Sequence, residues 1–220
     1  MRLRQEGSSA QAELDWMGYE VVMIRSRPIR AAVAALLLLA GAGPAPADTT
    51  HSIEFTYYPV AGRTPGEIYR SIVNRGPKVA GERAIAATSA RGVQNYSLQQ
   101  EGSSCRVVEN HVNFRFTVEM PKPTGLASLS ARDRGLWQQF TAFLKAHELQ
   151  HTRLWLRCAA DLDRKVLGIK TGNCKDAAQE AEDLWRKMKT ACDKKQVRFD
   201  SEQRAELLAQ PFMQRVMRGD

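Results

Sequence analysis

The stretch FLKAHELQHTRLW, residues 143–155, carries two of the four histidines of this 220-residue chain. His147 and His151 are four positions apart, and Glu148 follows the first of them directly. In an α-helix, residues four apart project from one face, so both imidazoles can bind a single ion. In the His-Glu-x-x-His pattern, zinc lowers the pKa of its bound water toward about 7 and the glutamate accepts the proton. The motif predicts a Zn²⁺ site with His147 and His151 as ligands and Glu148 as general base.

Two histidines do not complete a catalytic zinc site, which takes three protein ligands and leaves the fourth position to water. No histidine follows His151, and Cys158 lies about 10 Å further along the same helix, which is too far to share the ion. A second helix running back along the first would bring the region of Asp193 level with the histidines. The carboxylates from there onward are the candidates for the third ligand: Asp193, Asp200, Glu202 and Glu206.

The histidines lie within a long predicted helix. Ser130 with Asp133 forms a plausible N-cap, and apolar residues recur at steps of three and four as far as Gly168. The segment GIKTGNC then turns the chain, with Asn173 as the cap of a second helix that starts near Lys175. The pattern predicts two antiparallel helices, and the apolar positions on the histidine face are Phe140, Phe143, Leu144, Leu154 and Cys158.

The segment before these helices is strand-like. IEFTYYPV has strand composition, and residues 112–120 alternate between apolar and polar side chains, as a half-buried strand does. Between them, Thr64 and Glu67 form a capping box for one short helix that Gly76 ends. The predicted fold class is α+β: a small antiparallel sheet with one short helix, followed by a long antiparallel helical hairpin carrying the HExxH motif.

The N-terminal segment has the features of an export signal. Three arginines precede an apolar run at residues 31–40, followed by Ala45-Pro46-Ala47. That run is well short of the roughly 20 residues of a membrane span. We expect residues 1–22 to precede a translation start at Met23 or to be disordered, and residues 23–47 to be a Sec-type signal peptide cleaved after Ala47. Residues 48–220 then form a single zinc-peptidase-like domain that is periplasmic or secreted, with no stable membrane span.

Export sets the expected redox state and partners. An even number of cysteines in an oxidising compartment predicts two disulfides, with three pairings open among Cys105, Cys158, Cys174 and Cys192. The formal charge of +8 is spread along the chain without a nucleic-acid-binding motif, so no nucleic-acid partner is expected. His51 and His111 are expected to be ordinary surface histidines.

The chain resembles a bacterial family of predicted secreted zinc-dependent proteases, otherwise described as a domain of unknown function with an HExxH motif. The resemblance runs from about Tyr57 to Asp200 and implies a periplasmic or secreted metallopeptidase whose substrate is not established. It rests on YYPVAGRTPGEIYRSIVNRGP, AATS, CRVVENHVNFRFTVEMP, RGLWQQF, KAHELQH and the cysteine of TGNC.

One departure from the family pattern concerns the third ligand. Many members close with Tyr-Asp-x-x-Thr-x-His-Gly, whose histidine is the natural third ligand. Here RFDSEQRAE keeps the aromatic and the acid as Phe199 and Asp200 but places Ala205 at the histidine position. The resemblance therefore favours Asp200 as the third ligand, with Glu202 next, unless this branch builds its site differently.

Three functions follow from these patterns. The first is a zinc metallopeptidase acting on a peptide or protein substrate of the cell envelope, with the peptide paired to a strand such as residues 112–120. The second is a non-catalytic envelope binding or assembly module in which a structural metal braces the helices, favoured by the missing terminal histidine. The third is hydrolysis of amide bonds in cell-wall peptides, which uses the same metal chemistry.

Overall fold

The computed structural model describes residues 48–219. The predicted start at Met23, the signal peptide and its cleavage after Ala47 lie outside the described residues. None of the helices between residues 48 and 219 is long and apolar enough to cross a membrane. The elements follow in the order β1 (Asp48–Val60), α1 (Pro65–Arg75), β2 (Lys78–Val79), β3 (Glu82–Arg83), β4 (Ala87–Glu101), β5 (Ser104–Pro123), the 3-10 turn η1 (Leu126–Ser128), α2 (Ala131–Val166), β6 (Lys170–Thr171), α3 (Cys174–Ala209) and α4 (Pro211–Arg218).

The main sheet is mixed, so the predicted antiparallel sheet is wrong in its first strand. β5 lies in the centre, with β1 parallel to it on one side and β4 antiparallel on the other. The short strand β6 pairs antiparallel with the start of β5. Alternation of apolar and polar residues reveals which face of a strand is buried, but not the direction of its partner strand. The segment between β1 and β5, which includes α1 and β4, is long enough for β5 to run parallel to β1. The sheet is also long, because β5 alone has 20 residues.

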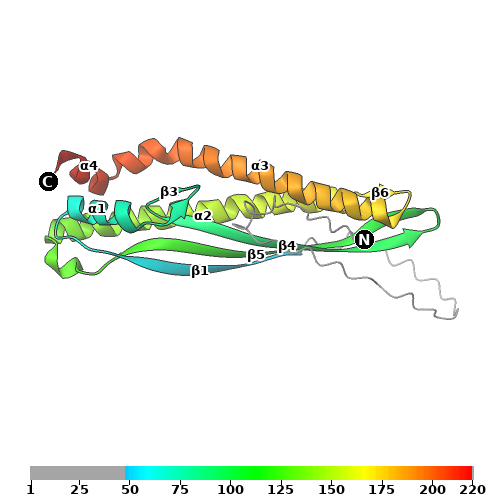
Figure 1. Cartoon of the computed structure of the whole chain (residues 1–220), viewed down its shortest axis with the longest axis horizontal. Coiled ribbons are helices and arrows are strands. Elements are labelled where there is room, and N and C mark those ends of the chain that lie inside the picture. Colours follow the sequence, from blue (N-terminus) through cyan, green and yellow to red (C-terminus); the bar gives the residue numbers. More distant parts are fainter. Residues whose placement is uncertain (1–47, 220) are drawn as a thin grey trace, which may run out of the picture.

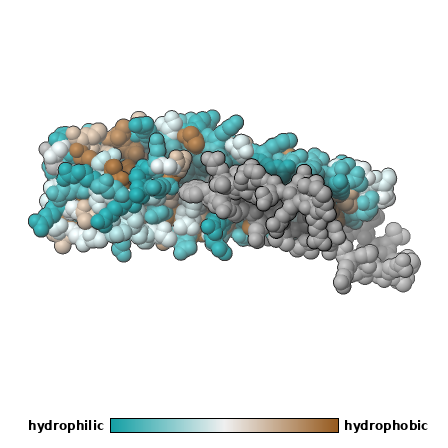
Figure 2. All heavy atoms as spheres, in the orientation of Figure 1, coloured by the Kyte–Doolittle hydropathy of each residue, from teal (hydrophilic) through white to brown (hydrophobic). Residues whose placement is uncertain are grey.

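One face of the sheet is buried under helices. Along β5, Val112, Phe114, Phe116 and Val118 are each at most 1% exposed, whereas Asn113 and Arg115 between them are exposed. Figure 1 shows α2 lying along the sheet and α3 lying along α2, in an elongated molecule. The face of the molecule seen in Figure 2 is mostly hydrophilic, with apolar atoms gathered at the end that carries α1 and α4.

The helix starts follow the predicted caps. The Thr64 hydroxyl accepts a hydrogen bond from the Glu67 amide at the start of α1, and Ser130 accepts one from the Asp133 amide at the start of α2. Asn173 caps α3 in the same way. The second long helix runs from Cys174 to Ala209, and no glycine or proline interrupts the chain before Pro211.

The described chain is a mixed α+β fold with four α-helices. Contacts between α2 and α3 join progressively earlier residues of α2 to later residues of α3. They include the disulfide between Cys158 and Cys192 and the hydrogen-bonding contact between His151 and Gln196. A second disulfide, between Cys105 and Cys174, ties the start of β5 to the start of α3. The structure thus selects one of the three pairings that the sequence left open, and no cysteine is free.

Candidate metal centre

Three potential ligand atoms converge where α2 faces α3. The Nε2 atoms of His147 and His151 lie 3.2 Å apart. Oδ1 of Asp200 is 3.1 Å from Nε2 of His147 and 2.9 Å from Nε2 of His151. Ligand atoms at 2.0–2.1 Å from one tetrahedral zinc lie about 3.3 Å from each other, so this triangle fits the donor set of a single ion. Two imidazoles and a carboxylate are a donor set that zinc and other divalent transition metals use.

Of the four carboxylates that the helix register left open, Asp200 lies beside the histidines, and it is also the one that the family resemblance favoured. Asp193, predicted to be level with the histidines, lies outside the group, and burial raises the pKa of its carboxyl while Lys189 lowers it. The register prediction is wrong because residues 167–173 continue past the end of α2 to form β6 before the chain reverses. Each residue of α3 is therefore displaced, and Asp200 takes the place predicted for Asp193.

The other predicted carboxylates do not reach the centre. Glu202 forms an ion pair with Arg198 on the surface of α3, with 3.2 Å between Oε1 and Nε. Glu206 is exposed one turn further along. His51 and His111, expected to be surface residues, are both exposed on strands of the sheet.

Gln196 fixes the orientation of one histidine. Its Oε1 lies 2.6 Å from Nδ1 of His151, and its Nε2 donates to the backbone carbonyl of His151 at 3.3 Å. Because an amide oxygen only accepts hydrogen bonds, Nδ1 carries a proton, so in the neutral ring the lone pair is on Nε2, which points toward His147 and Asp200. Outer partners of this kind hold metal-binding histidines in place. Gln196 was not predicted from the sequence, and the available signal was its position one turn before Asp200 on the same face.

Aromatic rings hold the other histidine. The ring of Phe199 stacks on His147 with centroids 4.8 Å apart, and the same ring meets His151 edge-on at 5.1 Å. The Phe143 ring is also stacked with His147, at 6.3 Å. Phe199 is the neighbour of Asp200, so one turn of α3 supplies both the carboxylate and the ring that orients the imidazoles.

Glu148 is buried beside this group, on the face of α2 that meets the sheet. It is 4% exposed, and its Oε2 accepts a hydrogen bond of 2.8 Å from the hydroxyl of Thr88 on β4. Burial raises the pKa of Glu148, whereas His151, Thr88 and His147 favour the charged carboxylate and lower it. The net shift is upward, which brings the carboxyl closer to the range where a group exchanges protons near neutral pH.

The contacts among the ionisable groups of the triangle favour the charged form of each partner. Burial alone lowers the pKa of His151, but hydrogen bonds to Asp200 and Gln196 and the nearby carboxylates reverse this and raise it. Burial raises the pKa of Asp200, yet its contacts with His147 and His151 lower it well below its ordinary value. Asp200 is therefore a carboxylate at neutral pH, the form that binds metal.

A family model matches most of the described chain. The model, for a bacterial protein of unknown function (DUF922), covers residues 55–206. That range contains the three residues of the triangle together with Glu148, Thr88 and Gln196. Comparisons with curated proteins and with solved structures gave no match.

Proposed function

This chain belongs to DUF922, a family of bacterial proteins of unknown function, and we propose that it is a periplasmic or secreted zinc-dependent metallopeptidase. The observation that carries the proposal is the convergence of His147, His151 and Asp200 within hydrogen-bonding distance, with Glu148 buried beside them. In this proposal α2 and α3 form the helical hairpin that carries the HExxH motif. The substrate is a peptide or protein of the cell envelope.

The roles of the residues follow from their contacts. Zinc, when held by the triangle, lowers the pKa of a bound water toward about 7 and polarises a substrate carbonyl. Oε2 of Glu148 is engaged by Thr88, so Oε1 is the oxygen that accepts a proton from the attacking water. The same carboxyl then donates the proton to the leaving amine. Thr88 keeps the buried side chain in one orientation throughout.

The centre has one accessible side. The side chain of Asp200 is 55% exposed and that of His147 is 17% exposed, while Glu148 is buried. A substrate therefore approaches past Asp200 rather than through the sheet. Two disulfides support the proposed periplasmic or secreted location, because disulfides persist in oxidising compartments.

The test of this proposal separates the base from the ligands. Glu148→Gln keeps the size of the side chain but removes its basicity, so hydrolysis of a labelled peptide library should fall by about 10²–10⁴-fold. Bound zinc, measured by elemental analysis, should stay at the wild-type level. Glu180→Gln on the exposed surface of α3 is the matched control and should retain full activity. Hydrolysis that survives Glu148→Gln would exclude this mechanism.

A second function is supported by the way the triangle joins two helices. His147 and His151 come from α2 and Asp200 from α3, so a bound metal also links the helices. A non-catalytic envelope module with a structural metal would unfold on chelation and show no hydrolysis beforehand. Cell-wall peptides included in the substrate library separate protein hydrolysis from hydrolysis of cell-wall amide bonds.

A further inference from the structure

The strand at residues 112–120, which was expected to pair with a peptide, is not available for it. β5 is the central strand and is paired over these residues with β1 on one side and β4 on the other. A peptide can add only to an outer edge of a sheet, where backbone groups are unpaired. Within residues 48–219 the outer strands of the main sheet are β1 and β4.

The two edges differ in how well they are protected. Pairing of β4 with β5 shifts register between Ser97 and Leu98, and such bulges discourage the addition of another strand. β1 pairs with β5 without a register shift from Asp48 to Val60. Within that stretch Pro59 removes one backbone donor, and no lysine or arginine protects the edge. The edge of β1 is therefore the better template for an incoming strand.

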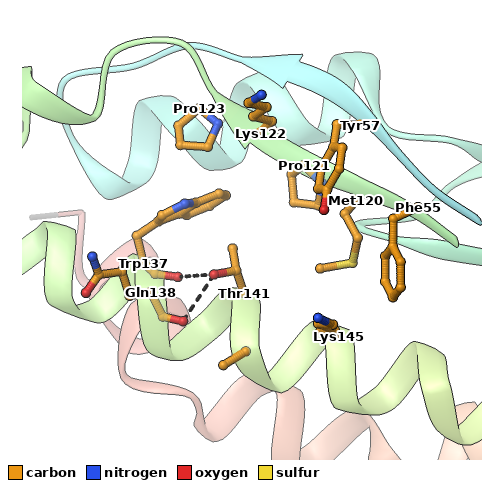
Figure 3. A pocket seen from close by; sticks show the side chains of 11 residues that line it. Phe55, Tyr57, Met120, Pro121, Lys122, Pro123, Trp137, Gln138, Thr141 and Lys145 are labelled. Atoms are coloured by element: carbon orange, nitrogen blue, oxygen red, sulfur yellow. Dashed lines mark hydrogen bonds between the residues drawn. The ribbon is translucent and has the colours of Figure 1, made fainter.

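A groove opens directly beside the β1 edge. Figure 3 shows that β1, the end of β5 and the first half of α2 line it, and its volume is about 540 Å³. We call it the β1 groove. Phe55 and Tyr57, which are two apart and so share one face of β1, form one wall, and Trp137 of α2 lies opposite. The edge strand itself thus supplies aromatic walls for a side chain of a partner.

The charge of the β1 groove is positive. Nζ of Lys145 lies 5.0 Å from the centroid of the Phe55 ring, and Nζ of Lys122 lies 5.8 Å from that of Tyr57. No carboxylate lines the groove, and among residues 48–219 neither lysine forms an ion pair. Two ammonium groups held over aromatic rings complement an acidic group beside an apolar one.

We propose that the β1 groove is a docking site for an extended, acidic polypeptide segment of a partner protein, which pairs as an added strand with the outer edge of β1. A large apolar side chain of that segment enters the groove, and a neighbouring carboxylate contacts Lys122 or Lys145. Backbone pairing gives such a complex its affinity and the groove gives it selectivity. The proposal does not depend on hydrolysis, because neither Glu148 nor any residue of the triangle lines the groove.

The experiment measures peptide binding to the Glu148→Gln protein, so that hydrolysis of the peptide does not affect the measurement. A fluorescent peptide of about nine residues, with a central phenylalanine flanked by glutamates, matches the length of a strand. We expect saturable binding by anisotropy, and at least about tenfold weaker binding when lysines replace the glutamates. Absence of binding to the acidic peptide would overturn the proposal. Binding with no hydrolysis by the wild-type protein would support it and count against the peptidase.

Two kinds of variant locate the site. Ala142→Trp fills the groove from an exposed position of α2, and the Lys122→Glu/Lys145→Glu pair reverses its charge. Each should weaken binding at least about tenfold, whereas Lys170→Glu at the far end of the molecule should change it less than twofold. Unchanged binding in Ala142→Trp would exclude the groove as the site.

Hydrogen exchange tests the added strand. Backbone amides of β1 should exchange more slowly when the peptide is bound, and those of β4 should not change. Slower exchange at β4, or none at β1, would show that the peptide does not pair with this edge. Dimers seen by light scattering in the absence of peptide, with the β1 amides protected from exchange in those dimers, would identify a second copy as the occupant and overturn the proposal.

Discussion

The helices α2 and α3 are joined in two different ways at neighbouring levels. At Cys158 and Cys192 the joint is covalent, and these residues are 4% and 0% exposed. One and two turns further along α3, Gln196 and Asp200 meet the histidines through polar contacts, and the Asp200 side chain is 55% exposed. The fold closes the helix pair with a bond where water is excluded, and leaves candidate ligand atoms where water has access.

Gln196 connects the two levels. Its Nε2 lies 3.8 Å from Sγ of Cys192 and 3.3 Å from the carbonyl oxygen of His151, and its Oε1 lies 2.6 Å from Nδ1 of His151. The disulfide fixes the turn of α3 that carries Gln196, and Gln196 fixes the ring of His151. We therefore expect the Cys158–Cys192 disulfide to set the geometry of the centre through Gln196.

Removing a ligand should give the largest change, because it acts on the polar level alone. His151→Ala takes away one of the three candidate ligand atoms, and we expect zinc affinity to fall by more than about a hundredfold, the upper range for loss of an outer partner. A competition titration with a chromophoric chelator measures this. His111→Ala, at an exposed position of β5, is the control and should bind zinc normally. Wild-type affinity in His151→Ala would show that the triangle is not the metal site.

Removing the Cys158–Cys192 disulfide should lower the free energy of unfolding by about 2–4 kcal/mol. We expect this for Cys158→Ala/Cys192→Ala in urea unfolding without metal. Zinc at about 100 times its dissociation constant should return about 2.7 kcal/mol, because it binds only the folded state. The Cys105→Ala/Cys174→Ala protein also loses a disulfide, but away from the centre, so its zinc affinity should equal that of the wild type. Equal zinc affinity in the two double variants would show that the Cys158–Cys192 disulfide does not set the geometry of the centre.

Removing the connection should have an intermediate effect. Gln196→Ala frees Nδ1 of His151, and we expect zinc affinity to fall by about 10–100-fold. Gln196→Glu retains an oxygen acceptor and should restore most of that loss. Both are read by the same competition titration, with unfolding in urea as a check on the fold. Equal losses in the two variants would assign Gln196 a packing role only.

Lowering the pH should have the smallest effect on zinc affinity, counted per pH unit. In the metal-free protein the pKa of His151 lies above its ordinary value of 6.5, which an NMR titration can measure. Its protonated form stabilises the metal-free fold below pH 6.5, and that contribution is lost as the pH rises through the raised pKa. Zinc needs the neutral ring, so affinity should fall by up to about tenfold per pH unit below that pKa. A pKa at or below 6.5 would contradict the contacts of Asp200 and Gln196.

Local signals predicted the helices of this fold better than its pairings. Ser130 and Asp133 lie three residues apart, and both the cap and the helical period that follows are properties of neighbouring residues. The direction of β1 and the partner of each cysteine depend on residues 34 to 69 positions apart, which no local pattern encodes.

The candidate site divides in the same way. The spacing of His147 and His151 predicted their convergence, because four residues make about one turn. Only the resemblance to a family singled out Asp200, since counting residues along two helices of unknown offset gave a level near Asp193 and left four carboxylates open from there onward. Gln196 was missed because its one signal, a position one turn before Asp200, has meaning only once Asp200 is placed beside the histidines.

The length of α3 has a consequence for how this centre can change. α3 continues without a break to Ala209, and Ala205 is exposed about 140° around it from Asp200. A histidine introduced at position 205 would point into solvent rather than toward the triangle. Restoring the histidine of the family pattern by a single substitution would therefore leave the ligand set as it is. A lineage or a designer seeking that ligand would first have to unwind the last turns of this helix.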